Sequence, residues 1–453
     1  MIELDVLIIG GGSAGEDAAS YSTKGSGSVG MVEKSLVGGA CVFNACIPTK
    51  ALVHAARTYK KMRDASFYGL PALDKSADYS QVKAFKDRII EGIGTGRDER
   101  MSKRGVRVFK GTARFVSAYE VIVNDEHIRA NKIIIATGSE AAVPPIPGLE
   151  DAGYITNVGA LDLSRVPERL AIIGGGPVGV EFTQIFSAFG SQVTIYEMTD
   201  RVVSMEDEEI SRSLGDLLSK QGVSIATSVK VSEIKRSGSG KLIVTEDRSG
   251  EKRTGEHDEI LVATGRKPVM DELNPSAAGI ETFKKGIKVD ASLQTNVPHI
   301  WAAGDITGTL YFTYVGYEQG KTAALNATTG RRGEMNYDIL PRATFCDPEI
   351  GSVGLTEAQA VEKGYRVKTG RYNYADMTRP IVSNETDGFI KIVAEVESGR
   401  ILGGHILGAE ASSLIHEVAA AMAGKMTVAE VGDILHSYPT FSEGVRYACQ
   451  TID

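Results

Sequence analysis

A glycine-rich turn occurs twice in this chain, and this repeat constrains the fold more than any other feature of the sequence. The first turn, "GGGSAG", follows the apolar run "DVLIIG" at residues 5–10 and precedes the helix-compatible segment "EDAASYST". The second turn has the same surroundings within residues 169–198, "RLAIIGGGPVGVEFTQIFSAFGSQVTIYEM". The glycines concerned are Gly10, Gly12, Gly15, Gly174, Gly176 and Gly179. Each copy predicts a strand, a helix and a second strand, which together make a βαβ unit.

An acidic residue follows each turn at the end of the second predicted strand, Glu33 in the first copy and Glu197 in the second. Turn and acid together are the fingerprint of a dinucleotide site, in which the helix N-terminus binds pyrophosphate and the acid bonds a ribose hydroxyl. Two copies therefore predict two dinucleotides. Because Glu197 would repel a 2′-phosphate, NADH is favoured over NADPH at the second site, although Arg201 nearby leaves NADPH as an alternative.

The rest of the chain supports a layered α/β architecture. Two further predicted strands end in Ala-Thr-Gly, and we count their glycines, Gly138 and Gly265, among the cofactor-binding residues. From Asn336 the pattern changes to strand-like runs such as "FIKIVAEV" and "ILGGHILG", followed by the helical run "SSLIHEVAAAMAGK". We predict an α/β fold with two nested Rossmann-like dinucleotide-binding domains and a C-terminal α+β domain, residues 336–453.

Charge and composition argue against several classes of partner. The chain of 453 residues has a net charge of −8, which argues against nucleic acid and against an anionic membrane surface. No apolar run approaches the ~18 residues of a membrane span. A signal peptide is not expected, because the first residues lack a basic region and a small-residue cleavage site. Four cysteines are too few for a secreted disulfide framework, so a cytoplasmic location is expected.

Two of the cysteines lie close together in "GGACVFNACIPTK" at residues 38–50. If a helix begins here, Cys41 and Cys46 lie about one turn apart, where a disulfide is possible and a helix N-terminus favours a thiolate. The alternatives are two structural cysteines or half of a metal site. No further Cys or His cluster accompanies the pair at the spacing of a zinc site. In a cytoplasmic protein such a pair indicates redox or metal chemistry.

Taken in order, the motifs resemble those of a known family. The first glycine turn, "GGACVFNACIPTK", "GGGPVG", "ATGRKP", "AAGD" and "YPTFSEG" follow one another over nearly the whole chain. In this order they resemble the class I flavoprotein disulfide reductases, the pyridine nucleotide-disulfide oxidoreductases, which include mercuric reductase, dihydrolipoyl dehydrogenase and glutathione reductase. The resemblance implies an FAD-dependent oxidoreductase with NADH or NADPH as electron donor and a redox-active disulfide between Cys41 and Cys46.

The resemblance also implies a division of labour along the chain. FAD would occupy the first glycine turn, with Glu33 at its adenosine ribose and Asp305 of "HIWAAGDITG" at its ribityl or phosphate region. The C-terminal domain resembles the family's dimerisation domain, so we expect a homodimer in which the last motif completes the partner subunit's site. The implied domains are FAD-binding at 1–148 and 270–335, NAD(P)-binding at 149–269, and dimerisation at 336–453.

Catalytic roles are implied for four residues near the flavin. Cys46 resembles the flavin-proximal thiol, which forms the charge-transfer pair, and Cys41 resembles the interchange thiol that meets the substrate. Lys50 and Glu181 match the Lys–Glu pair found beside the flavin, which would tune its electrostatics. The alternative for Glu181 is a charge on a helix surface.

The last motif, "HSYPTFSE" at residues 436–443, departs from the pattern of the disulfide-reducing members. They resemble it as His-x-His-Pro-Thr-x-x-Glu, in which the second His is the acid–base and the Glu orients it. Here Tyr438 takes that position, and its phenol titrates near ~10, so it is a poor base at neutral pH. The Glu remains as Glu443. In an extended segment His436 would share a face with Tyr438 and is the alternative proton carrier.

Mercuric reductases resemble this chain at the same point. They carry a Tyr there, before a segment similar to "SEGVRYACQT", and a second active-site Tyr at the position of Tyr154 in "DAGYITNVGALDL". A soft metal ion bound by two thiolates needs no general base to release a thiol. We therefore expect Cys41 and Cys46 to be transient metal ligands, and we predict no permanent metal site. The alternative for Tyr154 and Tyr438 is packing.

Three hypotheses remain for the function. The first is a mercuric reductase-like enzyme that acts on a soft metal ion or an unusual small-molecule disulfide. The second is dihydrolipoyl dehydrogenase, or another low-molecular-weight disulfide reductase, with Tyr in place of the base. Glu197 favours it, as does the absence of the vicinal Cys-Cys pair with which mercuric reductases end. The third is a flavin-binding interaction subunit with a vestigial redox pair.

Overall fold

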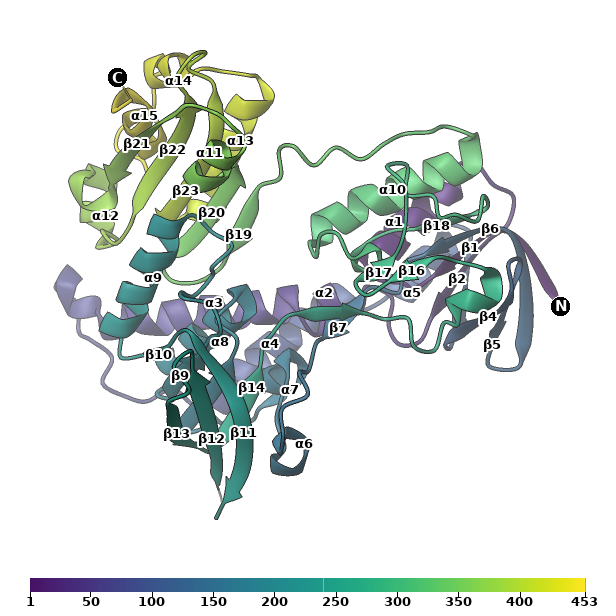
Figure 1. Cartoon of the computed structure of the whole chain (residues 1–453), viewed down its shortest axis with the longest axis horizontal. Coiled ribbons are helices and arrows are strands. Elements are labelled where there is room, and N and C mark those ends of the chain that lie inside the picture. Colours follow the sequence, from purple (N-terminus) through teal and green to yellow (C-terminus); the bar gives the residue numbers. More distant parts are fainter. Residues whose placement is uncertain (239, 453) are drawn as a thin grey trace. The chain divides into compact units, whose positions relative to one another are not determined.

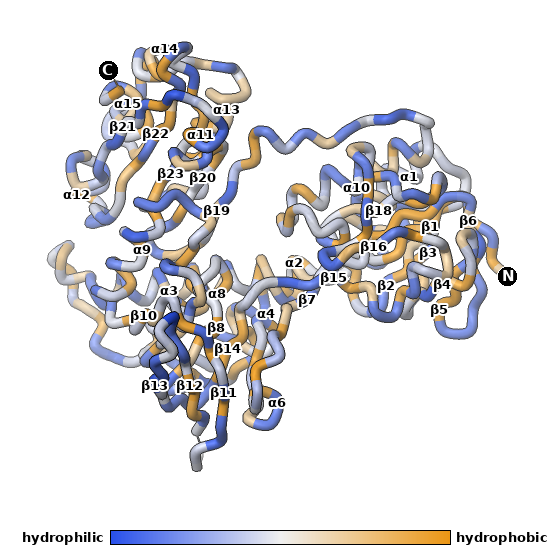
Figure 2. Tube along the Cα trace, in the orientation of Figure 1, coloured by the Kyte–Doolittle hydropathy of each residue, from blue (hydrophilic) through white to orange (hydrophobic). Residues whose placement is uncertain are grey.

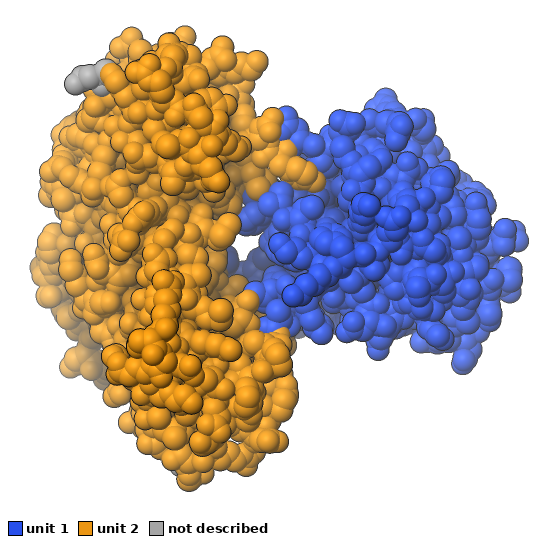
Figure 3. Space-filling view, viewed as in Figure 1, with its two compact units in different colours: residues 1–51, 84–142, 265–336 blue, residues 52–83, 143–264, 337–453 orange. Residues whose placement is uncertain are grey.

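The computed structural model describes residues 1–238 and 240–452 and divides into two compact units, drawn in blue and orange in Figure 3. The first unit comprises residues 1–51, 84–142 and 265–336, and the second comprises residues 52–83, 143–264 and 337–453. Two long helices, α3 (Cys46–Arg63) and α4 (Tyr79–Gly94), each have residues in both units.

A mixed sheet forms the centre of the first unit (Figure 1), parallel among β3, β2, β1, β6 and β18 and antiparallel where β5 pairs with β6 and β4. The strand order is β3-β2-β1-β6-β5-β4, and β18 also pairs with β6. In the central strand β1, Leu7 pairs with Gly30 of β2 on one side and with Ile133 of β6 on the other. β1 and β6 carry long apolar stretches, orange in Figure 2, because both faces of a parallel sheet are covered. The strands are β1 (Ile2–Ile9), β2 (Val29–Glu33), β3 (Val106–Lys110), β4 (Ala113–Ser117), β5 (Glu120–Val123), β6 (Glu126–Ile135) and β18 (Ile300–Ala302).

Two helices from opposite ends of the first unit's sequence pack closely on this sheet. Helix α1 (Ser13–Ser22) begins at the first glycine turn, and α10 (Thr313–Thr329) lies against it. Gly320 permits the approach, since a Cβ there would stand 2.1 Å from the backbone oxygen of Ala14. This packing holds the start of α10 next to the first glycine turn.

The remaining elements of the first unit are short. They are α2 (Gly39–Phe43), α5 (Arg97–Lys103), the paired strands β7 (Ser139–Ala141) and β15 (Arg266–Pro268), the paired strands β16 (Thr282–Phe283) and β17 (Gly286–Ile287), and the 3₁₀ turns η2 (Pro275–Ala278) and η3 (Asp305–Thr307).

The second unit contains the second βαβ arrangement. Its parallel sheet has the order β10-β9-β8-β14, and α8 connects β8 to β9 after the second glycine turn. A separate antiparallel sheet has the order β11-β12-β13, and β13 is hydrophilic in Figure 2. The elements are α6 (Leu149–Ala152), α7 (Asn157–Asp162), β8 (Arg169–Ile173), α8 (Pro177–Ala188), β9 (Gln192–Tyr196), α9 (Glu208–Lys220), β10 (Ser224–Ala226), β11 (Val229–Ser237), β12 (Gly240–Asp247), β13 (Lys252–His257) and β14 (Glu259–Val262).

The C-terminal part of the second unit is an antiparallel sheet of order β19-β20-β23-β22-β21, with α13 packed on β20 and β23. Together with the sheets of the two βαβ units, this C-terminal sheet confirms the predicted fold class, which is α/β with two Rossmann-like domains and an α+β domain. Among residues 1–238 and 240–452, no helix is long and apolar enough to cross a membrane. The elements of this C-terminal part are β19 (Arg342–Thr344), β20 (Glu349–Gly354), α11 (Glu357–Glu362), β21 (Val367–Asn373), η4 (Tyr374–Asp376), α12 (Thr378–Ser383), β22 (Phe389–Glu395), β23 (Ile401–Gly408), α13 (Ala411–Ala423), α14 (Val428–Asp433) and α15 (Glu443–Gln450). The short turn η1 (Ala65–Tyr68) follows α3 earlier in the second unit.

Candidate functional site

The first glycine turn has the shape of a phosphate cradle. A Cβ on Gly10, whose φ is +106°, would stand 2.3 Å from the backbone oxygen of Ala136, and a Cβ on Gly15 would stand 1.9 Å from that of Gly10. The chain itself therefore requires the outer two glycines. A Cβ on Gly12, the residue before α1, would meet nothing closer than 3.9 Å. The middle glycine faces open space at a helix N-terminus, which fits the pyrophosphate of a dinucleotide such as FAD.

The second glycine turn repeats this geometry. A Cβ on Gly174, whose φ is +107°, would lie 2.5 Å from the backbone oxygen of Ala263, and one on Gly179 would lie 2.0 Å from that of Gly174. Gly176 again faces open space, with no heavy atom within 4 Å of its ideal Cβ. The residues present therefore fit a second dinucleotide.

The two acidic residues hold equivalent places beside these turns. Glu33 Oε2 accepts from Gly11 N at 2.7 Å, and its Oε1 accepts from Ser35 N at 2.7 Å. Glu197 Oε2 accepts from Gly175 N at 2.6 Å, and its Oε1 accepts from Thr199 N and Thr199 Oγ1 at 2.7 and 2.9 Å. These bonds fix each carboxylate at the strand end, and its remaining lone pairs can accept ribose hydroxyls.

Arg201, the residue that leaves room for a 2′-phosphate, is engaged locally. Its guanidinium pairs with Asp200 at 3.0 Å and donates to the backbone oxygen of Ser204 at 3.1 Å. A phosphate would have to compete with both groups for this cation.

Asp305 lies in a polar cluster within the first unit. Burial raises the pKa of Asp305, while a hydrogen bond from the Ser139 hydroxyl and the charge of Arg266 oppose the rise. Arg266 also donates to Ser139 Oγ at 2.6 Å. Gly138 and Gly265 flank this cluster in left-handed conformations, φ +72° and +120°, with no atom within 4 Å of an ideal Cβ. Sequence analysis missed Arg266, because only the pairing of β7 with β15 brings it to Ser139.

The two cysteines lie on different helices, not on one. Helix α2 contains Cys41 and ends at Phe43, Asn44 breaks the chain with φ −149°, and Cys46 is the first residue of α3. The geometry of a single helix beginning in this segment is therefore wrong, because the chain turns between the two thiols. The expected helix N-terminus is found at Cys46.

The two thiols interact and differ in environment. Cys41 and Cys46 are free cysteines in the structure, and Cys41 is hydrogen-bonded to Cys46. This bond, burial and repulsion from Cys46 raise the pKa of Cys41, against an opposing effect of Lys50, so the Cys41 thiol keeps its proton at neutral pH. Cys46 Sγ lies 3.3 Å from the hydroxyl of Thr313 on α10. Thr313 is a contact that sequence analysis missed, since only the packing of α10 against α1 brings it there.

Glu16 on α1 forms an ion pair with Arg97, near the two cysteines. Glu16 Oε2 pairs with Arg97 Nη1 at 2.6 Å, and the side chains are 13% and 19% exposed. Burial raises the pKa of Glu16 although Arg97 opposes the shift. Tyr317 of α10 hydrogen-bonds Ser13, and burial raises its pKa. Ser13 lies in the first glycine turn, whereas no motif in the sequence marked Glu16, Arg97 or Tyr317.

Glu181 and Lys50 belong to different compact units, so their pairing stays a prediction. Glu181 is 5% exposed and accepts a hydrogen bond from the backbone of Phe345 at 3.0 Å. The alternative interpretation of Glu181, a charge on a helix surface, is therefore wrong.

The C-terminal motif holds its three titratable side chains apart. Tyr438 is 71% exposed and its hydroxyl lies 3.0 Å from Thr378 Oγ1. His436 Nε2 lies 2.7 Å from Glu417 Oε1, and the His436 side chain is only 7% exposed. The expectation that His436 and Tyr438 share a face is therefore wrong, because the segment is not an extended strand.

Glu443 is engaged by groups other than Tyr438. It is 6% exposed, and its carboxylate accepts from Thr440 N at 2.9 Å and from the Tyr447 hydroxyl at 2.8 Å. The family's Glu thus survives with a structural role at the start of α15.

Tyr154 lies in the second unit and is half-buried. Its hydroxyl donates to Glu150 Oε1 at 3.3 Å, and burial together with that carboxylate raises the pKa of the phenol. Tyr154 is therefore neutral at physiological pH.

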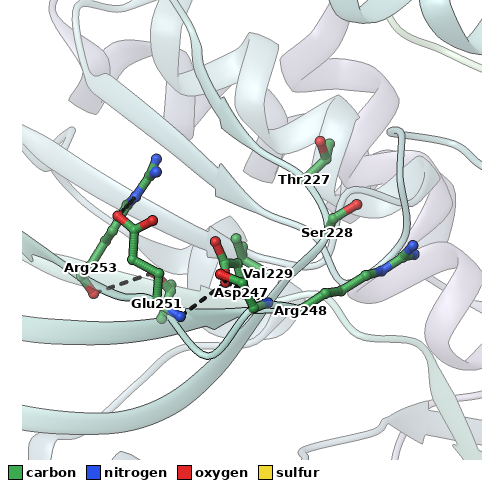
Figure 4. A pocket seen from close by; sticks show the side chains of 9 residues that line it. Thr227, Ser228, Val229, Asp247, Arg248, Glu251 and Arg253 are labelled. Atoms are coloured by element: carbon green, nitrogen blue, oxygen red, sulfur yellow. Dashed lines mark hydrogen bonds and ion pairs between the residues drawn. The ribbon is translucent and has the colours of Figure 1, made fainter.

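A pocket that sequence analysis did not anticipate opens in the second unit, beside the end of the strand that carries Glu197 (Figure 4). Its floor joins the strand end that carries Glu197, since Ser228 N donates to Thr199 O at 2.7 Å and Val229 N to Glu197 O at 3.1 Å. Asp247 Oδ1 accepts a hydrogen bond from the backbone N of Glu251 at 3.0 Å, and the Glu251 carboxylate pairs with Arg253 at 3.1 Å (Figure 4). The lining residues are Thr227, Ser228, Val229, Thr245, Asp247, Arg248, Ser249, Glu251 and Arg253.

Comparison with family models gives two matches. Residues 4–324 match the pyridine nucleotide-disulphide oxidoreductase model, and residues 340–449 match the dimerisation domain of the same family.

Curated relatives cover the whole chain. A mercuric reductase of Bacillus cereus is 35% identical over 453 residues, which is 100% of this chain and 72% of that protein. A dihydrolipoyl dehydrogenase of Bacillus subtilis is 35% identical over 451 residues, 98% of this chain and 98% of that protein.

Solved structures show the same likeness. The HOCl-induced flavoprotein disulfide reductase RclA of Escherichia coli superimposes with a TM-score of 0.89 at 29% identity, over 99% of this chain and 100% of that one. Its Cu(II) complex gives a TM-score of 0.88 at 29% identity, over 97% and 98%.

Proposed function

Since this chain belongs to the pyridine nucleotide-disulphide oxidoreductase family, whose members depend on FAD and NAD(P)H, we propose that it passes electrons through Cys41 and Cys46 to a thiophilic metal ion. An unusual small-molecule disulfide is the second acceptor class. Mercuric reductases among the relatives and the Cu(II) complex of the RclA structure support Hg(II) and Cu(II) as the metal ions to test.

The cofactor assignments follow the two glycine turns. Gly12, Glu33 and the Asp305 cluster would hold FAD at the first turn, and the bound flavin would supply two-electron redox chemistry between the nicotinamide and the cysteine pair. NADH at the second turn is favoured by Glu197 and by the engagement of Arg201 with Asp200. The domain assignments of 1–148 with 270–335, 149–269 and 336–453 belong to this proposal, as does a cytoplasmic location.

The single observation that carries the metal-ion proposal is the state of the C-terminal motif. Tyr438 stands at the position where a disulfide reductase of this family carries its base. Glu443 is bound to Thr440 and Tyr447, and His436 is bound to Glu417. The motif therefore places a phenol at the position of the base, with Glu443 and His436 each hydrogen-bonded to groups other than Tyr438.

The stoichiometry explains why such a site suits a metal ion. Reduction of a disulfide consumes a proton, NADH + H⁺ + RSSR → NAD⁺ + 2 RSH, and the departing thiolate needs an acid. Reduction of a metal ion instead releases a proton, NADH + Hg²⁺ → NAD⁺ + H⁺ + Hg⁰. The thiols of Cys41 and Cys46 would lose their protons as they bind the soft cation, because coordination favours thiolate. Exposed phenols such as Tyr438 would supply a polar lining.

The presence of the family's dimerisation domain supports a homodimer. Tyr438 and the neighbouring Leu435, 71% and 88% exposed, are available for such an interface. We propose that Tyr438 lines the active site of the partner subunit.

The test is a comparison of acceptors in wild type and in the Tyr438→His variant. Wild type should turn over Hg(II) or Cu(II) with NADH and give little activity with lipoamide. Tyr438→His should raise lipoamide turnover by about 10²- to 10⁴-fold, the usual contribution of a general acid–base, while Tyr438→Phe serves as the matched control that adds no imidazole. Efficient lipoamide turnover by wild type would instead support dihydrolipoyl dehydrogenase, which Glu197 also favours.

A further inference from the structure

A buried lysine of the C-terminal sheet contacts the nucleotide-binding part of the second unit. Lys391 lies on β22 and its side chain is 4% exposed. Its Nζ lies 3.3 Å from both carboxylate oxygens of Asp207, 2.6 Å from Glu209 Oε1 and 2.8 Å from Glu357 Oε2. Asp207 and Glu209 lie at the start of α9, whereas Glu357 is on α11. One ammonium group thus joins three carboxylates from two parts of the chain.

The ammonium group of Lys391 keeps its charge at neutral pH. Burial disfavours the charge on Lys391, but hydrogen bonds to Glu209 and Glu357 and the charge of Asp207 outweigh burial and raise its pKa. Two further cations flank the cluster. Arg342 lies 3.4 Å from Glu206, and Arg371 lies 3.1 Å from Glu209. Removing the central cation would leave the buried carboxylate of Asp207, 3% exposed, without its ammonium partner, and breaking a buried ion pair in this way is destabilising.

The cluster is linked through α9 to the second glycine turn. Asp207 caps α9, since its side chain accepts from Glu209 N at 3.1 Å. The segment just before it returns to the turn, where Val203 N donates to Gly175 O at 2.8 Å. Gly175 N in turn donates to Glu197 Oε2. A short chain of contacts therefore runs from Lys391 to the carboxylate assigned to the ribose.

The intermediate segment has a backbone conformation that needs support. Val203 has φ +41°, a left-handed conformation that β-branched residues rarely adopt, and it is 3% exposed. Such a residue persists only where its surroundings hold it. The hydroxyl of Ser211 on α9 donates to the backbone oxygen of Val202, so α9 supplies part of that support.

We propose that Lys391 is a positioning residue for the pyridine nucleotide: by holding Asp207 and the start of α9, it sets the conformation of residues 198–206 and of the second glycine turn. The inference rests on the proposed function in one respect, that the second turn binds NAD(P)H. It means that the C-terminal domain contributes to nucleotide affinity as well as to dimerisation.

The test uses three variants of the FAD-loaded protein. Lys391→Met removes the charge and keeps the length, Lys391→Arg keeps the charge, and Lys363→Met changes an exposed lysine on the same domain as a matched control. Stopped-flow reduction by NADH gives the apparent Kd and the limiting rate of flavin reduction. We expect Lys391→Met to raise Kd about tenfold with the limiting rate within about twofold, and Lys391→Arg to recover most of the loss. An unchanged Kd in Lys391→Met would overturn the proposal.

A second measurement separates this inference from the proposed function. Hydrogen exchange of residues 198–206 should be faster in Lys391→Met than in wild type and in Lys363→Met, whether or not NADH reduces the flavin. If Lys391→Met does not fold, Asp207→Asn replaces it, because Asn caps a helix as well as Asp but lacks the charge that faces Lys391. Unchanged exchange in the variant that folds would refute the positioning role. Wild-type protein that NADH and NADPH fail to reduce would refute the proposed function alone.

Discussion

The two equivalent carboxylates beside the glycine turns allow a prediction with a built-in control. In Glu197→Gln, the carboxamide must face two backbone donors, Gly175 N on one oxygen and Thr199 N on the other, at 2.6 and 2.7 Å. An amide has only one oxygen, so its NH₂ group opposes one of these N–H groups. The variant therefore loses a charge-assisted hydrogen bond and the charged acceptor for the ribose hydroxyl.

The expected size of the effect follows from these bonds. A hydrogen bond to a charged group contributes about 1.5–3 kcal/mol, and each 1.36 kcal/mol corresponds to about a factor of ten. We expect the apparent Kd for NADH to rise by about ten- to hundredfold, and the preference for NADH over NADPH to fall because the repulsion of a 2′-phosphate is removed. Anaerobic stopped-flow reduction of the flavin with each nucleotide measures both quantities.

Glu33→Gln is the matched control, because Glu33 makes the same two contacts with Gly11 and Ser35 at the first turn. It should lower the retained FAD per chain and leave the Kd for NADH unchanged in the FAD-loaded fraction. If Glu33→Gln alters NADH affinity while Glu197→Gln does not, the assignment of the two turns is refuted.

Three further predictions concern other parts of the molecule. Thr313→Val removes the hydroxyl 3.3 Å from Cys46 Sγ and should weaken the long-wavelength thiolate–flavin absorbance of the reduced enzyme, while an unchanged spectrum would show that this contact does not act on the thiolate. Burial lowers the pKa of His405, so between pH 6.5 and the lower pKa of the folded state the unfolded chain binds a proton that the folded chain does not. The contribution of His405 to the free energy of unfolding should therefore be fully present above about pH 6.5. As the pH falls below about 6.5, this contribution should decrease by at most ~1.4 kcal/mol per pH unit. Urea titrations at pH 7.5 and 5.5 should show this component lost in His405→Gln, whose amide can still donate to the Leu355 carbonyl, and an equal decline in both proteins would contradict it. Gly320→Ala places a methyl group 2.1 Å from the Ala14 carbonyl and should lower stability by about 1–3 kcal/mol, measured by thermal unfolding.

The parts of the fold that follow from local pattern were predictable from the sequence. The two glycine turns, the acids Glu33 and Glu197 and the strands around them are specified within about 30 residues each, the length of one βαβ unit. The C-terminal helices and strands carry equally clear periodicity. In these segments the local preference and the tertiary fold agree, and the predicted class is confirmed.

The features that sequence analysis missed depend on distant packing. Thr313 reaches Cys46 only because α10 lies on α1, and Arg266 reaches Ser139 only through the pairing of β7 with β15. The break at Asn44 could not be read from helix propensity, and neither could the burial of His436 against Glu417. The contacts of Thr313, Arg266 and His436 each join elements whose relative placement no single stretch of sequence encodes.

The central claim is that reduced Cys41 and Cys46 pass electrons to a metal ion without a general base. The most direct test is an anaerobic titration of the FAD-loaded protein with NADH, followed through the long-wavelength thiolate–flavin absorbance, with lipoamide added to one sample and Hg(II) or Cu(II) to another. The account predicts that NADH produces the absorbance and that only the metal ion discharges it with turnover. Discharge by lipoamide at a comparable rate, or absence of the absorbance after full reduction by NADH, would contradict it.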